Sequence, residues 1–153
     1  MNKAKFLIVI SLVLTALVYS CTKDNLPEEN PLTKLEILVR QPWQVDEVMS
    51  NVGCKNLHFV RDGINNTGVD YSKFRLTFKV DGTGTYTNET GVTYTTTWEF
   101  TSADQHNMKL LVNSSTPQIF VWNMVEISKT SFQSITALDK LSILQSTRYV
   151  PVP

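Results

Sequence analysis

The clearest pattern in the chain is the strict alternation between Val92 and Thr101. Successive side chains of a strand point to opposite faces, so this segment predicts a strand with one buried face and one threonine-rich exposed face. Tyr71–Val80 alternates in the same way. Asp81-Gly82 follows it directly and predicts a tight hairpin turn, since both central residues of such a turn need positive φ. The inward positions of the two strands are Phe74, Leu76, Phe78, Val80, Val92, Tyr94, Thr96, Trp98 and Phe100.

The same pattern along the chain gives eight strands and almost no helix. The predicted strands are Trp43–Met49, Tyr71–Val80, Thr83–Asn88, Val92–Thr101, His106–Val112, Gln118–Ile127, Ser131–Ala137 and Leu141–Val150, with Leu57–Val60 as a doubtful ninth. Short strands joined by short turns indicate an all-β sandwich or barrel. Consecutive hairpins favour an eight-stranded antiparallel up-and-down barrel, which has no free edges. Ser50–Asp70 is predicted to be a long loop.

One short helix is predicted at the start of this domain. Thr33 can cap it and Glu36, three residues later, completes a capping box, while Pro42 stops it from continuing. The helix, over Thr33–Arg40, is too short to stand alone, so we expect it to plug another element. Gln118–Ile127 is apolar on both faces and is a candidate for the surface that it covers.

The N-terminus has the pattern of an export signal. Lys3 and Lys5 precede the apolar run Phe6–Tyr19, and this run is shorter than the about 20 residues that a membrane-spanning helix needs. We therefore expect residues 1–20 to be removed. The segment that comes next, residues 21–32, is polar and acidic with two prolines, which predicts a flexible tether to a single domain at 33–153.

Val18-Tyr19-Ser20-Cys21 resembles the lipobox of bacterial lipoproteins. The resemblance implies cleavage before Cys21 and lipid attachment to its sulfur, through acyl chains such as palmitate, so that the membrane is a partner. It implies a cell-envelope location, outer membrane in preference to inner, on the periplasmic or the cell-surface side. The alternative is an ordinary secretory signal followed by a chance cysteine.

A second resemblance lies in the domain itself. Leu35–Trp43, the hairpin Phe78–Tyr86 and the run Thr97–Phe100 resemble the lipocalin-like lipoproteins of Bacteroides-type bacteria. The family implies an eight-stranded barrel and often an apolar ligand. It also implies that Arg148 of the last strand covers the ring of Trp43 on the first strand, whereas the alternative leaves Arg148 solvated. Gln41 departs from the glycine that lipocalins usually place two residues before this tryptophan.

Composition and candidate chemistry point away from catalysis. The chain has 14 basic and 14 acidic residues, so no basic excess suggests a nucleic-acid partner. Neither His58 nor His106 has neighbours at metal-ligand spacing. Cys54 and His58 could form a thiol–imidazole pair, but without an orienting partner Cys54 is better interpreted as a small apolar filler. We therefore predict no enzyme activity, metal or cofactor.

Two functions remain after these exclusions. The first is a binding module, because an eight-stranded barrel can hold one small ligand. The second is a structural or interaction lipoprotein with a filled core, which the large interior residues favour at one end of the barrel. For the binding module, the candidate apolar lining is Phe74, Phe78, Tyr94, Trp98 and Val121, and the candidate polar groups are Tyr94, Thr96 and Asn123.

Overall fold

The computed structural model describes residues 31–52, 55–138 and 143–153. The signal segment, most of the tether, Cys21 and Cys54 lie outside these residues. The described elements are the helix α2 (Lys34–Val39), the 3-10 turn η2 (Tyr71–Lys73), and the strands β1 (Trp43–Val52), β2 (Lys55–Val60), β3 (Arg75–Phe78), β4 (Thr83–Thr87), β5 (Thr93–Phe100), β6 (Met108–Asn113), β7 (Gln118–Ile127), β8 (Phe132–Leu138) and β9 (Ile143–Pro151).

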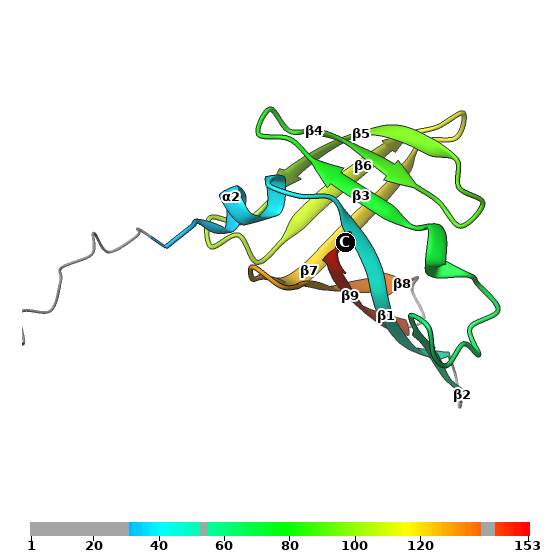
Figure 1. Cartoon of the computed structure of the whole chain (residues 1–153). Helices are drawn as coiled ribbons and strands as arrows, with labels where there is room; N and C mark the ends of the chain where they lie inside the picture. Colours follow the sequence, from blue (N-terminus) through cyan, green and yellow to red (C-terminus); the bar gives the residue numbers. More distant parts are fainter. Residues whose placement is uncertain (1–30, 53–54, 139–142) are drawn as a thin grey trace, which may run out of the picture. The chain divides into compact units, whose positions relative to one another are not determined.

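The strands form a closed antiparallel barrel of eight strands with one strand added (Figure 1). From β3 to β9 each strand pairs with the next, and β1 closes the circle by pairing with β9 along Trp43–Ser50. The predicted barrel is therefore confirmed, and the sandwich is excluded. The doubtful strand at Leu57–Val60 exists as part of β2, which lies outside the circle.

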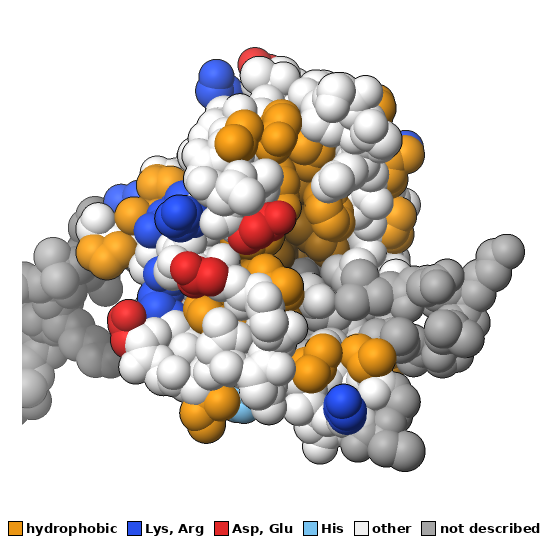
Figure 2. All heavy atoms as spheres, turned by 90° about the vertical axis from the view of Figure 1, so that its right-hand side faces the viewer, with side chains coloured by type: hydrophobic (Ala, Val, Ile, Leu, Met, Phe, Trp, Pro, Cys, Tyr) orange, Lys and Arg blue, Asp and Glu red, His pale blue; other side chains and the backbone are white. Residues whose placement is uncertain are grey.

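The barrel wall divides where β1 meets β3. Only Trp43 and Gln44 of β1 pair with β3, and from Glu47 onward the same edge of β1 pairs with β2 instead. The prediction of one long loop over Ser50–Asp70 is thus wrong in its first half, which is the β1–β2 hairpin. Figure 2 views the molecule from the right-hand side of Figure 1, away from α2, and shows a hollow lined by hydrophobic side chains.

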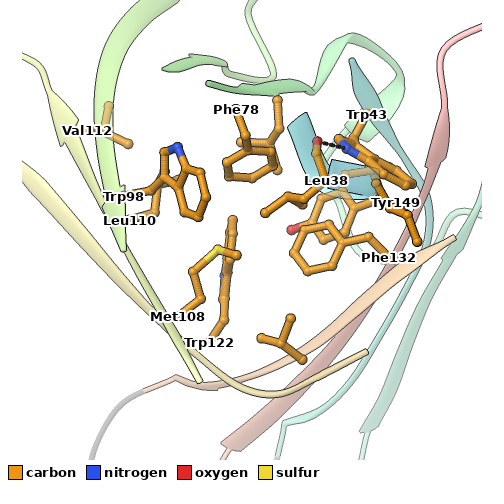
Figure 3. Packing of buried hydrophobic residues seen from close by; sticks show 14 of the residues in the cluster. Leu38, Trp43, Phe78, Trp98, Met108, Leu110, Val112, Trp122, Phe132 and Tyr149 are labelled. Carbon is orange, nitrogen blue, oxygen red and sulfur yellow. Dashed lines mark hydrogen bonds between the residues drawn. The ribbon is translucent and has the colours of Figure 1, made fainter. Parts of the chain in front are cut away.

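The helix α2 closes the other end of the barrel. Its capping box is present, because Glu36 N donates to Thr33 Oγ1 at 3.2 Å and Thr33 N donates to the Glu36 carboxylate at 2.7 Å. Leu38 is fully buried, and its carbonyl accepts a hydrogen bond of 2.9 Å from Trp43 Nε1 (Figure 3). The helix contacts β3 and β7, so the expectation that it acts as a plug is confirmed.

Behind this plug the barrel is filled by aromatic rings. Phe132 is fully buried at the centre and stacks on Tyr149 with a centroid distance of 4.8 Å. Three further rings meet Phe132 edge-on, those of Trp122 at 5.5 Å and of Trp43 and Phe78 at 6.1 Å. Figure 3 shows these rings converging from strands on all sides of the barrel. Such edge-on and offset contacts suit the charge distribution of aromatic rings.

A β-bulge in β7 explains why that strand is apolar on both faces. The pairing with β8 shifts register between Asn123 and Glu126, and Met124 has a φ of 50°. Before the bulge Phe120 and Trp122 point inward, whereas Val121 is 50% exposed; after it, Val125 is buried. The strand therefore changes its inner face half-way, and the prediction of Val121 as an inward residue is wrong.

The predicted contact between Arg148 and Trp43 is also wrong, although the first and last strands, β1 and β9, do pair and close the barrel. The register places Trp43 opposite Pro151 and Arg148 opposite Glu47. Trp43 lies inside the barrel, while Arg148 lies outside and pairs with Asp46 at 2.7 Å and with Glu47 at 3.3 Å. A β-bulge between Val45 and Glu47 brings both carboxylates to that side.

Candidate functional site

The half of the barrel away from α2 contains a cavity. Its volume is about 70 Å³, counted as the space open to the centre of a water-sized sphere. Figure 2 looks toward the hydrophobic hollow on this side of the molecule. The cavity is lined by Trp43, Val45, Tyr71, Phe74, Arg75, Leu76, Tyr86, Phe120, Trp122, Thr136, Gln145, Thr147 and Tyr149.

One wall of the cavity is a continuous series of aromatic rings. Tyr71 contacts Phe74 at a centroid distance of 5.1 Å, Phe74 contacts Tyr86 at 5.7 Å, and Tyr86 contacts Phe120 at 5.7 Å. Phe120 then stacks on Trp122 at a centroid distance of 6.4 Å, with 29° between the ring planes. These rings come from η2, the loop after it, β4 and β7. Together they form an apolar surface that suits a flat or aliphatic molecule.

The opposite wall is polar and comes from β8 and β9. Thr136 lies opposite Gln145 in the sheet, and Gln145 Nε2 donates to Thr147 Oγ1 at 3.3 Å. Thr136 and Thr147 are buried despite their hydroxyls. Buried polar groups are costly unless they find hydrogen-bond partners. A polar strip facing an aromatic wall is the arrangement by which pockets orient a mainly apolar ligand.

The tyrosine hydroxyls of the cavity stay neutral at physiological pH. Burial, and then the charge of Glu89, raise the pKa of Tyr86 to about 12. Burial likewise raises the pKa of Tyr149 far above its ordinary value. Both phenols can therefore donate or accept hydrogen bonds without charge.

Two arginines lie beside the gap in the wall between β1 and β3, and Arg61 bridges it. Arg61 Nε donates to the Val45 carbonyl at 2.7 Å, its Nη2 donates to the same oxygen, and its Nη1 donates to Ser72 O at 3.2 Å. Arg75 Nη1 donates to Ser72 O at 2.7 Å and to Phe74 O at 2.8 Å. Arg61 thus replaces the missing strand partner at Val45. Arg75 closes the turn and also lines the cavity.

The structure brings only part of the predicted site together. Phe74 lines the cavity as expected. Phe78 and Trp98 point inward, but they pack on each other at 5.3 Å in the filled end, and Trp98 Nε1 donates to Thr83 O at 3.0 Å. They belong to the core, so their predicted role as cavity lining is wrong.

The remaining candidates lie elsewhere. Tyr94 lies in a second, more polar hollow beside Tyr86 and Glu89. Thr96 is buried inside the barrel, and its Oγ1 finds no hydrogen-bond partner among the described residues. Asn123, like Val121, belongs to the outward set of β7 before the bulge and does not line the cavity.

Sequence reasoning missed the residues that make the cavity distinctive. Tyr86, Gln145 and Thr147 all occupy inward positions of predicted strands, so period-two alternation could have identified them. No comparable pattern in the sequence identifies Arg61 and Arg75. Their role depends on where β1 separates from β3, which is a property of the strand pairing and not of the local pattern.

The other candidate chemistry is dispersed. His58 Nε2 lies 2.8 Å from Glu47 Oε1, on the β1–β2 hairpin. Within residues 31–52, 55–138 and 143–153, no group of three or more His, Cys, Asp or Glu side chains could hold a metal ion. Among the described helices, none has the length and apolar character needed to cross a membrane.

Comparisons with known proteins give no further guide to this site. The sequence matches no protein-family model and no curated protein. The geometry of the cavity is therefore the main indication of its function.

Proposed function

We propose that this protein is a non-enzymatic binding protein that holds one small, mainly apolar ligand in the open half of its barrel. The observation that carries the proposal is the contrast between the two halves. The half behind α2 is filled by the rings around Phe132, whereas the other half contains a cavity with an aromatic wall and a polar strip. A barrel that served only as a scaffold would gain stability by filling this space.

The size of the cavity limits the ligand. One water needs roughly 10–15 Å³ on the same measure, so a cavity of about 70 Å³ has room for about five waters. This space suits a molecule of one or two rings or a short aliphatic chain. A larger ligand would have to displace the rings of Tyr71 and Phe74, which lie at the margin of the cavity next to η2.

We further propose that the barrel is tethered to the cell envelope, with the outer membrane as the expected site. The support is the lipobox-like Val18-Tyr19-Ser20-Cys21 after an export-type N-terminus, together with the resemblance to lipocalin-like lipoproteins. Two or more acyl chains on Cys21 would hold the protein stably without a spanning helix. A ligand carrier fixed in this way would work at the membrane surface.

Native mass spectrometry of the protein purified from its own host tests the binding proposal. We expect a co-purifying small molecule in the wild type, and its loss in Thr136→Leu, which would fill the polar side of the cavity. Thr95→Leu is the matched control, because Thr95 is exposed on the outer face of β5. A bare protein mass under conditions that keep other weak complexes intact would contradict the proposal.

A second candidate is a structural or interaction lipoprotein of the envelope. The observation in its favour is the apolar outer surface of β7, where Ile119 is 59% exposed beside the half-exposed Val121. Leu111 and Ile119 also border a shallow groove on this face. A stable protein partner, lost in Ile119→Asp and retained in Thr136→Leu, would favour this function over ligand binding.

A further inference from the structure

Two guanidinium groups meet at the edge of the cavity. Arg61 Nη1 and Arg75 Nη1 donate to the same acceptor, Ser72 O, at 3.2 and 2.7 Å. Arg61 also directs its Nε and Nη2 to the Val45 carbonyl, so all sides of its guanidinium are used by the backbone. Arg61 therefore acts as a structural bridge.

Arg75 differs from Arg61 because one edge of its guanidinium has no partner among the described residues. Its Nη1 is occupied by Ser72 O and Phe74 O, but Nε and Nη2 make no hydrogen bond to the described residues. The Nε–Nη2 edge is one of the two edges that a carboxylate can accept in a bidentate pair. Among the residues that line the cavity, Arg75 is the one with a permanent charge.

No carboxylate of the described residues forms an ion pair with either of these two cations. The ion pairs of the described residues involve only His58 and Arg148 as the basic partners, on the outer side of the β1–β2 hairpin and β9. Burial lowers the pKa of Arg75 below its ordinary value, and the charge of Arg61 lowers it further. Neither cause is a neighbouring carboxylate, which agrees with the absence of an ion pair to Arg75 among the described residues.

We propose that the ligand of the cavity carries a carboxylate or a comparable anionic group. This group pairs with the Nε–Nη2 edge of Arg75, while the apolar body of the ligand lies against the aromatic wall. This inference rests on the proposed binding function and specifies its ligand class. The polar strip of Thr136, Gln145 and Thr147, on the other wall, would accept hydrogen-bonding groups along the ligand body.

Two acidic side chains near the cavity partly offset the positive charges of Arg61 and Arg75. Asp70 accepts from Ser72 N at 2.9 Å, and this hydrogen bond lowers the pKa of Asp70, to which the charges of Lys73 and Arg61 add smaller effects. Glu89 is exposed, and its charge adds to the effect of burial in raising the pKa values of Tyr71 and Tyr86. Asp70 is engaged in capping η2, whereas Glu89 is free to repel an anion. Glu89→Gln should therefore strengthen carboxylate binding.

The test uses two probes of the same shape, naphthalene-2-carboxylate and its neutral amide. Binding is followed by tryptophan fluorescence, since Trp122 lines the cavity, and by calorimetry. We expect the wild type to bind the carboxylate about tenfold more tightly than the amide, because a charge-assisted hydrogen-bond pair is worth about this factor. High salt should weaken the binding of the carboxylate but not the binding of the neutral amide.

The variants locate the effect. Arg75→Gln should abolish the preference for the carboxylate over the amide, and Arg75→Lys should restore this preference only in part, because an ammonium group lacks the planar fork. Lys109→Gln is the control, since it removes one positive charge from the outer side of β6. Thermal unfolding of each variant checks that the barrel is intact.

The outcomes separate this inference from the proposed function. The anion site would be overturned if the wild type binds the two probes equally, or if the preference for the carboxylate survives Arg75→Gln. The cavity would then remain as an apolar binding site. If neither probe binds, the proposal that the cavity binds a ligand is overturned, and the anion site with it.

Discussion

Replacement of Phe132 by alanine should destabilise this protein more than any change at the open end of the barrel. Phe132 is fully buried and contacts four aromatic rings, including a stacked contact with Tyr149 at 4.8 Å. Truncation of a core phenylalanine costs roughly 3–5 kcal/mol. Each aromatic contact adds about 0.5–1.5 kcal/mol beyond burial. We therefore expect a loss at the upper end of the first range, about 5 kcal/mol.

Urea unfolding followed by tryptophan fluorescence measures this loss. With a denaturant slope of about 2 kcal/mol per molar for a domain of this size, the midpoint should fall by about 2–3 M. Phe132→Leu should cost less, because it keeps much of the volume. Since the whole domain is stabilised by roughly 5–15 kcal/mol, the leucine variant keeps the test informative if the alanine variant does not fold.

Phe120→Ala is the matched control. Phe120 contributes the same side chain, but it is only half-buried and lies at the cavity. Its truncation should cost about 1–2 kcal/mol, because less apolar surface is lost from the interior. If Phe132→Ala costs no more than Phe120→Ala, the division into a filled half and an open half is refuted.

Three further predictions concern lipid attachment at Cys21, the close packing at Gly84 of β4 and the capping box of α2. Cys21→Ala should release the protein from the membrane fraction, and continued membrane association with the signal removed would contradict lipid attachment there. Gly84→Ala should destabilise the barrel by about 2 kcal/mol or more in urea unfolding, because an added Cβ would lie 2.1 Å from Thr77 O. The backbone and hydroxyl of Thr33 hold the pKa of Glu36 below its ordinary 4.5, so this carboxylate stabilises the fold above that pH and ceases to do so as the pH falls through the lower folded pKa. Glu36→Gln should therefore reduce the loss of stability between neutral and acidic pH, as measured by the urea midpoint.

Much of the fold could be predicted because its signals are local. Alternation in Val92–Thr101 fixes which side chains share a face, and Asp81-Gly82 marks the position of a turn, without reference to the rest of the chain. The predicted type of that turn is wrong, because Gly82 has positive φ and Asp81 does not, and the turn spans Lys79 to Thr83. Thr33 and Glu36 likewise specify the start of α2 within one turn of backbone. The closure of the barrel followed from the succession of short hairpins.

The cavity could be predicted only in part. Alternation placed Phe74, Phe78 and Trp98 inside the barrel, and all three do point inward. It could not say which end of the barrel each residue occupies. That depends on the tilt and register of all the strands and on the position of α2, so Phe78 and Trp98 proved to be core while Phe74 lines the cavity.

The order of the strands and, for most of them, the inner face were therefore encoded locally, since both arise from a period of two along the backbone. The bulge at Met124, which reverses the face of β7, and the outward pairing of Arg148 with Asp46 emerge only in the folded barrel. The same is true of the separation of β1 from β3, beside which Arg75 lies at the cavity with one guanidinium edge that makes no hydrogen bond to the described residues. Each of these depends on pairing between residues far apart in the chain, and such pairing is set by how the whole barrel closes and packs.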